Sequence, residues 1–213
     1  MFIIPCKFDS RSPILECIQS IQKFYPNEKI VIVDSCSNDK SYFDYIKPEV
    51  FDIIEGNYNY EIGAYLTAYK KYPNEDKYFC IHDSLIMTGK INDFDLNKLL
   101  ITVQWFNGFW DDAEQKAFAE NMIGKTLVNS QFIGCFGSIM ICDGVVLNKL
   151  QKFIKPHHLP TNKKQSCAFE RILGILLGNV MGLNLTNSLQ GQHVTIEHKY
   201  NESFCKKIFI KRQ

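Results

Sequence analysis

A carboxylate interrupts an apolar segment of the chain at Asp83, which follows His82 inside YFCIHDSLIM at residues 78–87. A charged side chain within an apolar segment costs free energy unless a partner compensates it. The partner could be a polar group of the core, a set of turn amides, or a bound metal ion. A second carboxylate, Asp34, stands at the end of another apolar run, KIVIVDS, at residues 29–35. Carboxylate oxygens are ligands for Mg²⁺ and Mn²⁺, and Mn²⁺ also accepts imidazole nitrogen.

The segments that carry these residues alternate between strand and helix patterns. Apolar strands are predicted at residues 2–5, 29–35, 50–56 and 77–81. Ser12 and Pro13 are typical of a helix cap and first turn, and another helix is predicted at residues 61–72. Repeated strand–helix units predict an α/β fold with a mostly parallel central sheet between two layers of helices. Because ligands bind beyond the carboxyl ends of such strands, Asp34 and Asp83 are expected on one ligand-binding edge.

The second half of the chain is less regular but continues the alternation. Residues 105–110 and 155–165 are predicted to be loops, and a strand is predicted within residues 132–142. Helices are predicted at residues 111–125, 143–153 and 165–182. The length of 213 residues is that of one domain with a substantial core, so residues 1–213 are predicted to form a single domain.

Bulk composition excludes several classes of protein. The net charge of +1 gives no electrostatic reason to expect a nucleic-acid partner. Eight cysteines without a C-x-x-C pair predict reduced thiols in a cytoplasmic protein rather than zinc ribbons or disulfides. No apolar run reaches the ~18 residues of a transmembrane helix. The sequence also lacks the G-x-G-x-x-G, phosphate-loop, G-x-S-x-G and H-E-x-x-H motifs, which argues against dehydrogenases, P-loop enzymes, α/β-hydrolases and zinc peptidases.

The order and spacing of the remaining motifs resemble GT-A-type glycosyltransferases of the family-2 kind. FIIPC, then SPILECIQSIQKFYPNEKIVIVDSCSNDKS, resembles their first strand, helix and strand, with an S-x-D after Asp34 that ends at Asp39. NYNYEIGAYLTAY at residues 57–69 resembles their N-x-G-x-x-x-A helix. YFCIHDS then lies where the family carries its metal-binding D-x-D. The likeness is good over residues 1–90 and looser beyond.

The resemblance implies a donor site in residues 1–90 for a nucleotide-diphosphate sugar, most simply a UDP-sugar. Asp34 would contact the base or ribose, and its alternative is a turn carboxylate. Asp83 would be the main ligand of a Mn²⁺ or Mg²⁺ ion that neutralises the diphosphate, with His193 as a further ligand or a structural histidine. Asp39 would bind the donor or cap a short helix. The other predicted donor contacts are Pro5, Gly63, His82 and Gly137.

The resemblance places the acceptor side in residues 91–213. Glu170 occupies the place of the family's acidic residue, so it would be the general base of an inverting transfer. The alternative is a helix-stabilising glutamate paired with Arg171 or Lys163. The apolar faces of sugars pack on aromatic rings, so Trp105, Phe109 and Trp110 could stack on the acceptor, and their alternative is a place in the core.

Two other functions fit the same residues. A sugar-nucleotide nucleotidyltransferase would use a similar edge of the sheet, although CKFDSRSP after the first strand lacks the glycines usual in that class. A catalytically inactive GT-A-like binding domain would explain why one carboxylate stands where the family has two. The acceptor could be a glycan, a protein or a lipid-linked molecule, and the sequence is compatible with a homo-oligomer.

Overall fold

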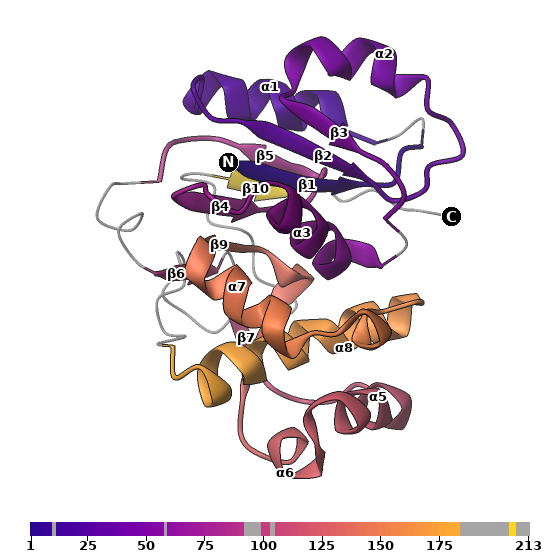
Figure 1. The fold of residues 1–213 in the computed structure, drawn as a ribbon, viewed down its shortest axis with the longest axis vertical. Coiled ribbons are helices and arrows are strands. Elements are labelled where there is room, and N and C mark those ends of the chain that lie inside the picture. The colour runs from indigo at the N-terminus through magenta and orange to yellow at the C-terminus, as the bar shows by residue number, and fades with distance from the viewer. Residues whose placement is uncertain (10–11, 58, 92–98, 103–104, 184–204, 208–213) are drawn as a thin grey trace.

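The computed structural model describes residues 1–9, 12–57, 59–91, 99–102, 105–183 and 205–207, with the backbone alone at 101–102, 105–107 and 206–207. Within these residues the main sheet has six strands in the order β3-β2-β1-β4-β9-β6 (Figure 1). The parallel strands are β1 (Phe2–Cys6), β2 (Ile30–Asp34), β3 (Asp52–Ile54) and β4 (Lys77–Cys80). The strand β9 (Met140–Asp143) pairs antiparallel with β4 on one side. On its other side β9 pairs antiparallel with β6 (Leu100–Thr102). The predicted mostly parallel α/β sheet is confirmed.

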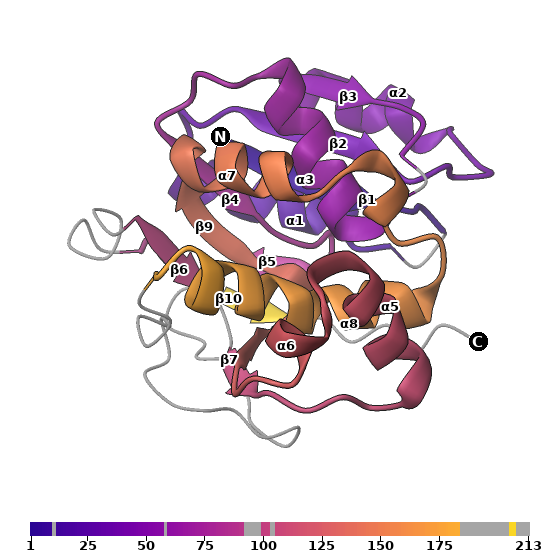
Figure 2. The ribbon, with the colours of Figure 1, turned by 60° about the horizontal axis from the view of Figure 1, so that its bottom comes forward.

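Helices cover both faces of the sheet, as Figures 1 and 2 show. Because successive side chains of a strand point to opposite faces, Phe2 and Ile4 enter one core while Ile3 enters the other. The first core lies under α1 (Ile14–Phe24) and α2 (Tyr42–Ile46), the latter followed by a short 3₁₀ turn at Lys47–Glu49. The second lies under α3 (Tyr60–Lys71), α7 (Gly144–Phe153) and α8 (Lys163–Gly174). The three layers predicted from the sequence are therefore present.

The second half adds a smaller group of elements around α8. The helices α5 (Ala113–Ile123) and α6 (Lys125–Val128) lie below α8 in Figure 1. A two-stranded antiparallel sheet of β7 (Trp105–Asn107) and β8 (Ile133–Cys135) packs against α8 through β8. A second small sheet joins β5 (Leu85–Met87) to β10 (Cys205–Lys207). None of the described helices combines the length and apolar character needed to span a bilayer.

Four expectations for the second half need correction. The single strand expected within residues 132–142 is two strands, β8 and β9, separated by a tight turn at Phe136–Ser138. The helix expected at 165–182 begins at Lys163 and becomes a π-helix at Ile175–Val180. The loop expected at 155–165 contains a 3₁₀ turn at Pro156–His158, and the first half of the 105–110 loop is strand β7. Glycines and prolines marked these breaks, but tertiary pairing set their limits.

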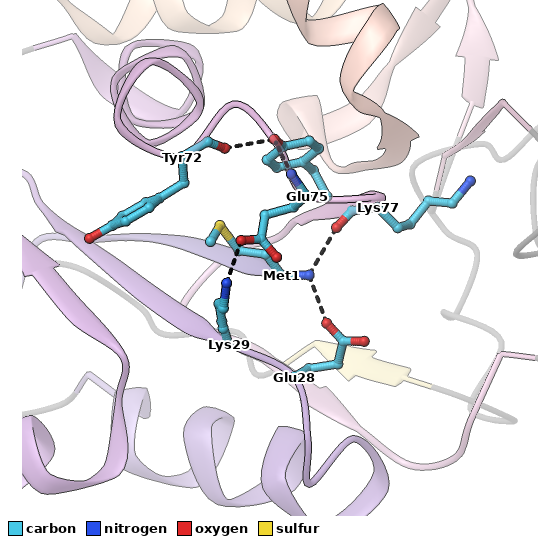
Figure 3. Close-up of polar contacts among 7 residues, drawn as sticks. Met1, Glu28, Lys29, Tyr72, Glu75 and Lys77 are labelled. Carbon is cyan, nitrogen blue, oxygen red and sulfur yellow. Dashed lines mark hydrogen bonds and ion pairs between the residues drawn. The ribbon is translucent and has the colours of Figure 1, made fainter.

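Polar contacts join the amino ends of three neighbouring strands. The Met1 ammonium donates to Glu28 Oε2 at 2.7 Å and to the Lys77 carbonyl at 2.9 Å (Figure 3). An ion pair of 2.6 Å between Lys29 Nζ and Glu75 Oε1 lies beside them. A hollow of about 240 Å³ is found at this end, lined in part by Gln22, Glu28, Glu49 and Phe51. It lies at the opposite end of the strands from Asp34 and Asp83, so it is not the predicted ligand site.

Candidate active site at the carboxyl edge of the sheet

Pro5 shapes the edge at which the predicted site lies. The Ile81 N–H donates to the Ile3 carbonyl at 3.1 Å, and the paired residues of β1 and β4 end at Ile3 and Cys80. Proline has no N–H with which to continue a ladder, so a strand can leave its neighbour at that point. The chain after β4 then turns sharply, with the Leu85 N–H bonded to the His82 carbonyl at 3.1 Å. Pro5 therefore contributes to releasing His82 and Asp83 from the sheet at this edge, and its contact with a donor stays a prediction.

Asp34 lies at the same edge but is fully buried. Its Oδ1 accepts a hydrogen bond from the Tyr42 hydroxyl at 2.7 Å, and its Oδ2 accepts one from the Ser37 N–H at 3.2 Å. Burial and this carboxylate raise the pKa of Tyr42 well above its usual range. This geometry is that of the turn carboxylate, the alternative considered from the sequence. Both carboxylate oxygens of Asp34 therefore have partners within the protein. The contact of Asp34 with the base or ribose stays a prediction.

Replacing Tyr42 with phenylalanine should destabilise the fold by about 1–3 kcal/mol, because a buried carboxylate oxygen loses its donor. Urea unfolding followed by circular dichroism measures this change. The control is Tyr45→Phe, since Tyr45 is 45% exposed and its loss should cost less than about 0.5 kcal/mol. Equal midpoints for the two variants would show that the Tyr42–Asp34 bond does not organise the loop.

Asp39 is exposed and serves the turn before α2. Its Oδ1 accepts a hydrogen bond from the Ser41 N–H at 2.8 Å, and bonds from Ser41 hold its pKa below the usual range. Asp39 thus stabilises the turn that leads into α2 without capping the helix, because the cap position is held by Ser41 without a side-chain bond, and its contact with a donor stays a prediction.

Gly63 allows a polar loop to pack against the start of α3. A Cβ at this position would lie 2.4 Å from Asn59 Cβ and 2.8 Å from Asn57 Oδ1. Asn57 is buried, and its N–H donates to the Asp34 carbonyl at 3.1 Å. Gly63 therefore lets this loop reach the end of β2. Its direct contact with a donor stays a prediction.

Asp83 and His82 have protein partners in this structure. Ser12 Oγ donates to Asp83 Oδ2 at 3.1 Å, so the expectation that Ser12 caps α1 is wrong; Pro13 holds the cap position without a side-chain bond. His82 Nε2 lies 2.6 Å from the Gly137 carbonyl oxygen. A carbonyl oxygen only accepts, so Nε2 carries the proton in this contact.

The described residues do not by themselves fit a divalent cation. His82 Nε2 is protonated and cannot be a metal ligand while it donates to Gly137. No group of three or more histidine, cysteine, aspartate or glutamate side chains suited to a metal occurs in the described part of the chain. Asp83 is the one predicted ligand that can be placed, since His193 lies outside the described residues.

Gly137 links His82 to Glu170 through one backbone turn. Its φ of +63° is in the left-handed region that favours glycine, and a Cβ would lie 2.9 Å from His82 Cε1. Its carbonyl accepts from His82, and its N–H stabilises the ionised carboxylate of Glu170. Two residues predicted for the donor side and the predicted base are therefore brought together, although 88 positions separate His82 from Glu170.

Glu170 is a largely buried carboxylate with an unusual protonation equilibrium. It projects from α8, whose first turn is capped by Asn162 accepting from the Gln165 N–H at 3.0 Å. Burial raises the pKa of Glu170 to about 7, although Arg171, the Gly137 N–H and Lys163 oppose the change. The pairing with Arg171 weighed as an alternative is present but long, at 3.7 Å from Nη1 to Oε2. A carboxylate whose pKa lies near neutrality can accept a proton during a reaction.

The sequence reasoning missed Glu61 as a residue of this site. Ser166 Oγ donates to Glu61 Oε2 at 2.9 Å, which joins the first turn of α3 to α8. Burial raises the pKa of Glu61, but attraction to His82 and Lys163 and the Ser166 bond bring it below its usual value. A glutamate in the first turn of a helix is common, so its position carried no signal of a site.

The aromatic segment contributes Phe109 rather than Trp110 to the surface. The Trp110 indole donates from Nε1 to the Val128 carbonyl at 3.2 Å and packs against Phe132, which is the core alternative. Phe109 is 52% exposed, and its ring centroid is 5.4 Å from the Arg171 guanidinium carbon. Trp105 lies in β7, but its side chain is outside the described residues.

Arg171 fixes the aromatic segment to α8. It is buried, and it donates from Nε to the Phe109 carbonyl at 2.7 Å and from Nη2 to Asp111 Oδ1 at 2.6 Å. The same guanidinium therefore contacts the Phe109 ring and lies beside Glu170. An exposed aromatic ring is thus held next to the candidate base.

Comparison with solved structures identifies the architecture. S. aureus TarS, a glycosyltransferase, aligns with a TM-score of 0.56 at 14% identity over 96% of this chain and 35% of the TarS chain. The fold is GT-A-like. TarS 1–349 in complex with UDP aligns with a TM-score of 0.49 at 14% identity, over 81% of this chain and 54% of that one. CMP:2-keto-3-deoxy-manno-octonic acid synthetase complexed with CTP gives a TM-score of 0.47 at 12% identity, covering 95% and 92% of the two chains.

No family model matches the chain, and no curated protein matches it either. The chain spans about a third of the full TarS chain and about half of TarS 1–349. At these identities the likeness concerns the fold, and the activity has to be argued from the site.

Proposed function

We propose that this chain is a glycosyltransferase that moves a sugar from a nucleotide-diphosphate sugar to an acceptor hydroxyl. The observation that carries the proposal is Glu170, a largely buried carboxylate with a pKa of about 7, beside the Gly137 turn whose carbonyl accepts from His82 at the carboxyl edge of the sheet. The GT-A-like fold shared with the glycosyltransferase TarS supports the same class of reaction. UDP is the expected nucleotide because of the sequence resemblance.

The chemistry assigned to Glu170 is that of a general base. The acceptor hydroxyl transfers its proton to the carboxylate while its oxygen forms a bond to the anomeric carbon. The bond between that carbon and the phosphate oxygen breaks, and its electron pair leaves with the nucleoside diphosphate. Attack on the face opposite the leaving group inverts the anomeric configuration. Base assistance of this kind contributes about 10²–10⁴-fold to a rate.

A divalent cation would neutralise the diphosphate of the donor. Mn²⁺ or Mg²⁺ would stabilise the charge that develops on this leaving group. Asp83 and His193 would hold it. The proton transfer assigned to Glu170 uses the carboxylate of this residue and not the residues that would hold the ion.

Binding and turnover of sugar nucleotides test the proposal. UDP-glucose, UDP-N-acetylglucosamine, GDP-mannose and CTP are screened by thermal shift, each with Mn²⁺ and with EDTA, and UDP release is assayed for the donors that bind. A donor at about 100 times its Kd should stabilise the protein by about 2.7 kcal/mol. No stabilisation by any sugar nucleotide would contradict the proposal. Pyrophosphate release from CTP and a sugar acid would identify a nucleotidyltransferase, and binding without turnover would identify an inactive binding domain. A shift that survives EDTA would keep the glycosyltransferase and remove the metal.

Replacing Phe109 with alanine should lower transfer to sugar acceptors about tenfold, since the loss of stacking on an exposed ring costs about 0.5–1.5 kcal/mol. UDP release to water should be unchanged, because the proposal assigns the ring to the acceptor and not to the donor. Transfer to a panel of methyl glycosides and donor hydrolysis are measured in parallel. Trp110→Phe is the matched variant: it removes the bond to Val128 and should lower stability without this selective loss of transfer. Equal effects of both variants on transfer would contradict the assignment of Phe109.

A further inference from the structure

Polar contacts join the two halves of the chain around Glu170. His82, on the turn after β4, bonds to the Gly137 carbonyl, and the Gly137 N–H stabilises the ionised carboxylate of Glu170 on α8. One turn earlier on α8, Ser166 bonds to Glu61 of α3. Electrostatic attraction to His82 also lowers the pKa of Glu61.

Glu61 lies in the first turn of α3, at the point where this helix contacts α8. Its contact with Ser166 spans 105 residues of sequence at 2.9 Å. A second bond, from Asn59 Nδ2 to the Pro160 carbonyl at 3.2 Å, joins the same ends of the two elements. In a helix, residues four apart lie on one face, so Ser166 and Glu170 face the same side of α8. Fixing Ser166 therefore fixes the direction in which Glu170 projects.

The two carboxylates have opposite protonation preferences. His82 and Lys163 hold the pKa of Glu61 below its usual range, whereas burial raises that of Glu170 to about 7. The negative charge of Glu61 adds to the rise at Glu170, because like charges disfavour ionisation. A pair of carboxylates whose environments separate their pKa values is typical of acid–base sites.

We propose that Glu61 is a positioning residue for the transfer reaction, which holds the Ser166 turn of α8 and His82 so that Glu170 faces the donor edge as a base. This inference rests on the proposed function. The alternative role for Glu61 is stabilisation of the α3 amino terminus, which would affect folding but not Glu170. The other groups that face Glu170 stay constant in the test: Arg171, Lys163 and Cys167 of its own helix α8, the Gly137 N–H, and Cys135 of β8.

Two substitutions at Glu61 separate the effect of its negative charge from the effect of its side-chain length. Glu61→Gln keeps an oxygen for the Ser166 hydroxyl but removes the charge. Glu61→Asp keeps the charge but is too short by one methylene to keep the Ser166 contact in place. The matched control is Glu16→Gln, because Glu16 is an exposed glutamate in the first turn of α1.

The titration of Glu170 is measured in the full chain by ¹³C NMR of glutamate carboxyl groups, with Glu170→Gln to assign the signal. Glu61→Gln should lower the midpoint of Glu170 by about half a pH unit or more, and Glu16→Gln should leave it unchanged. In donor hydrolysis, the acid limb of kcat should move to lower pH with Glu61→Gln. Glu61→Asp should lower kcat about tenfold while donor KM changes little.

An unchanged Glu170 midpoint in Glu61→Gln, with folded protein, would overturn the inference and leave the proposed function intact. Thermal unfolding that falls equally in both Glu61 variants, without any change in kcat or its pH profile, would also overturn it. Failure of the wild-type protein to bind any sugar nucleotide would instead contradict the proposed function. The NMR titration would then still show whether Glu61 controls Glu170.

Discussion

Replacing Glu170 with glutamine is expected to reduce transfer by about 10²–10⁴-fold, because the acceptor loses its general base. Glutamine has the same shape and can still accept the Gly137 N–H, so the site should keep its geometry. The expected loss lies in kcat, with donor affinity nearly unchanged. Steady-state UDP release together with the donor Kd from calorimetry separates the two. Loss of donor affinity with kcat retained would assign Glu170 to donor binding instead.

The pH profile provides a second measure of Glu170. A base must be ionised, so the wild-type kcat should rise with pH through about 7, the pKa of Glu170. The residual activity of Glu170→Gln should lack this step. A wild-type profile that is flat between pH 5.5 and 8.5 would contradict the role of this carboxylate as the base.

The same group should make the fold less stable at high pH. The pKa of Glu170 is about 7 in the folded protein and 4.5 in a model compound, so the folded state binds the proton more tightly. The associated stabilisation is complete below about pH 4.5 and is lost as pH rises through 7. Glu170→Gln should therefore be more stable than wild type at pH 8, by an amount of order 3 kcal/mol at most. Urea unfolding at pH 5 and pH 8 measures this difference. Identical unfolding of wild type and Glu170→Gln at pH 8 would show that burial does not raise the pKa of this carboxylate.

Replacing Gly174 with alanine is expected to destabilise the protein by about 3 kcal/mol or more, the upper range for overpacking. A Cβ at Gly174 would lie 1.7 Å from the Ile133 carbonyl oxygen and 2.8 Å from its carbonyl carbon. Both are backbone atoms of β8, so no side-chain rotation relieves the clash. The helix α8 would have to move away from β8, the strand that leads to Gly137.

Chemical unfolding and the NMR spectrum of Gly174→Ala test this expectation. In an unobstructed helix, alanine is more stable than glycine by about 1 kcal/mol. Ala117→Gly on the exposed face of α5 supplies the control, since it should destabilise by about that amount. Gly174→Ala must therefore show the opposite sign from the propensity. A stabilised Gly174→Ala protein would mean that α8 does not pack against β8 at this distance.

The sheet could be predicted from the sequence because its strands are bounded apolar runs. KIVIVDS and KYFCI each contain a short unbroken apolar run, as buried parallel strands do, and the helix at residues 14–24 has its apolar residues on one face. Asp34 and Asp83 each stand at the carboxyl end of such a strand. Because parallel strands end at the same edge of a sheet, the strand patterns also predicted that these two residues would lie at one edge. They failed where a local pattern had two outcomes: Ser12 has the type and position of a helix cap, but its hydroxyl bonds to Asp83.

The sequence by itself therefore determined the layers of this protein, the edge at which its polar residues gather, and Glu170 as a candidate base. Only the tertiary structure decided which polar groups meet there. It buried Asp34 against Tyr42, turned Gly137 between His82 and Glu170, and placed Glu61 against Ser166. The physical reason is the range of the interactions. Strand and helix patterns depend on neighbours within a few residues, whereas burial and contacts between side chains up to 105 positions apart depend on how the helices pack on the sheet.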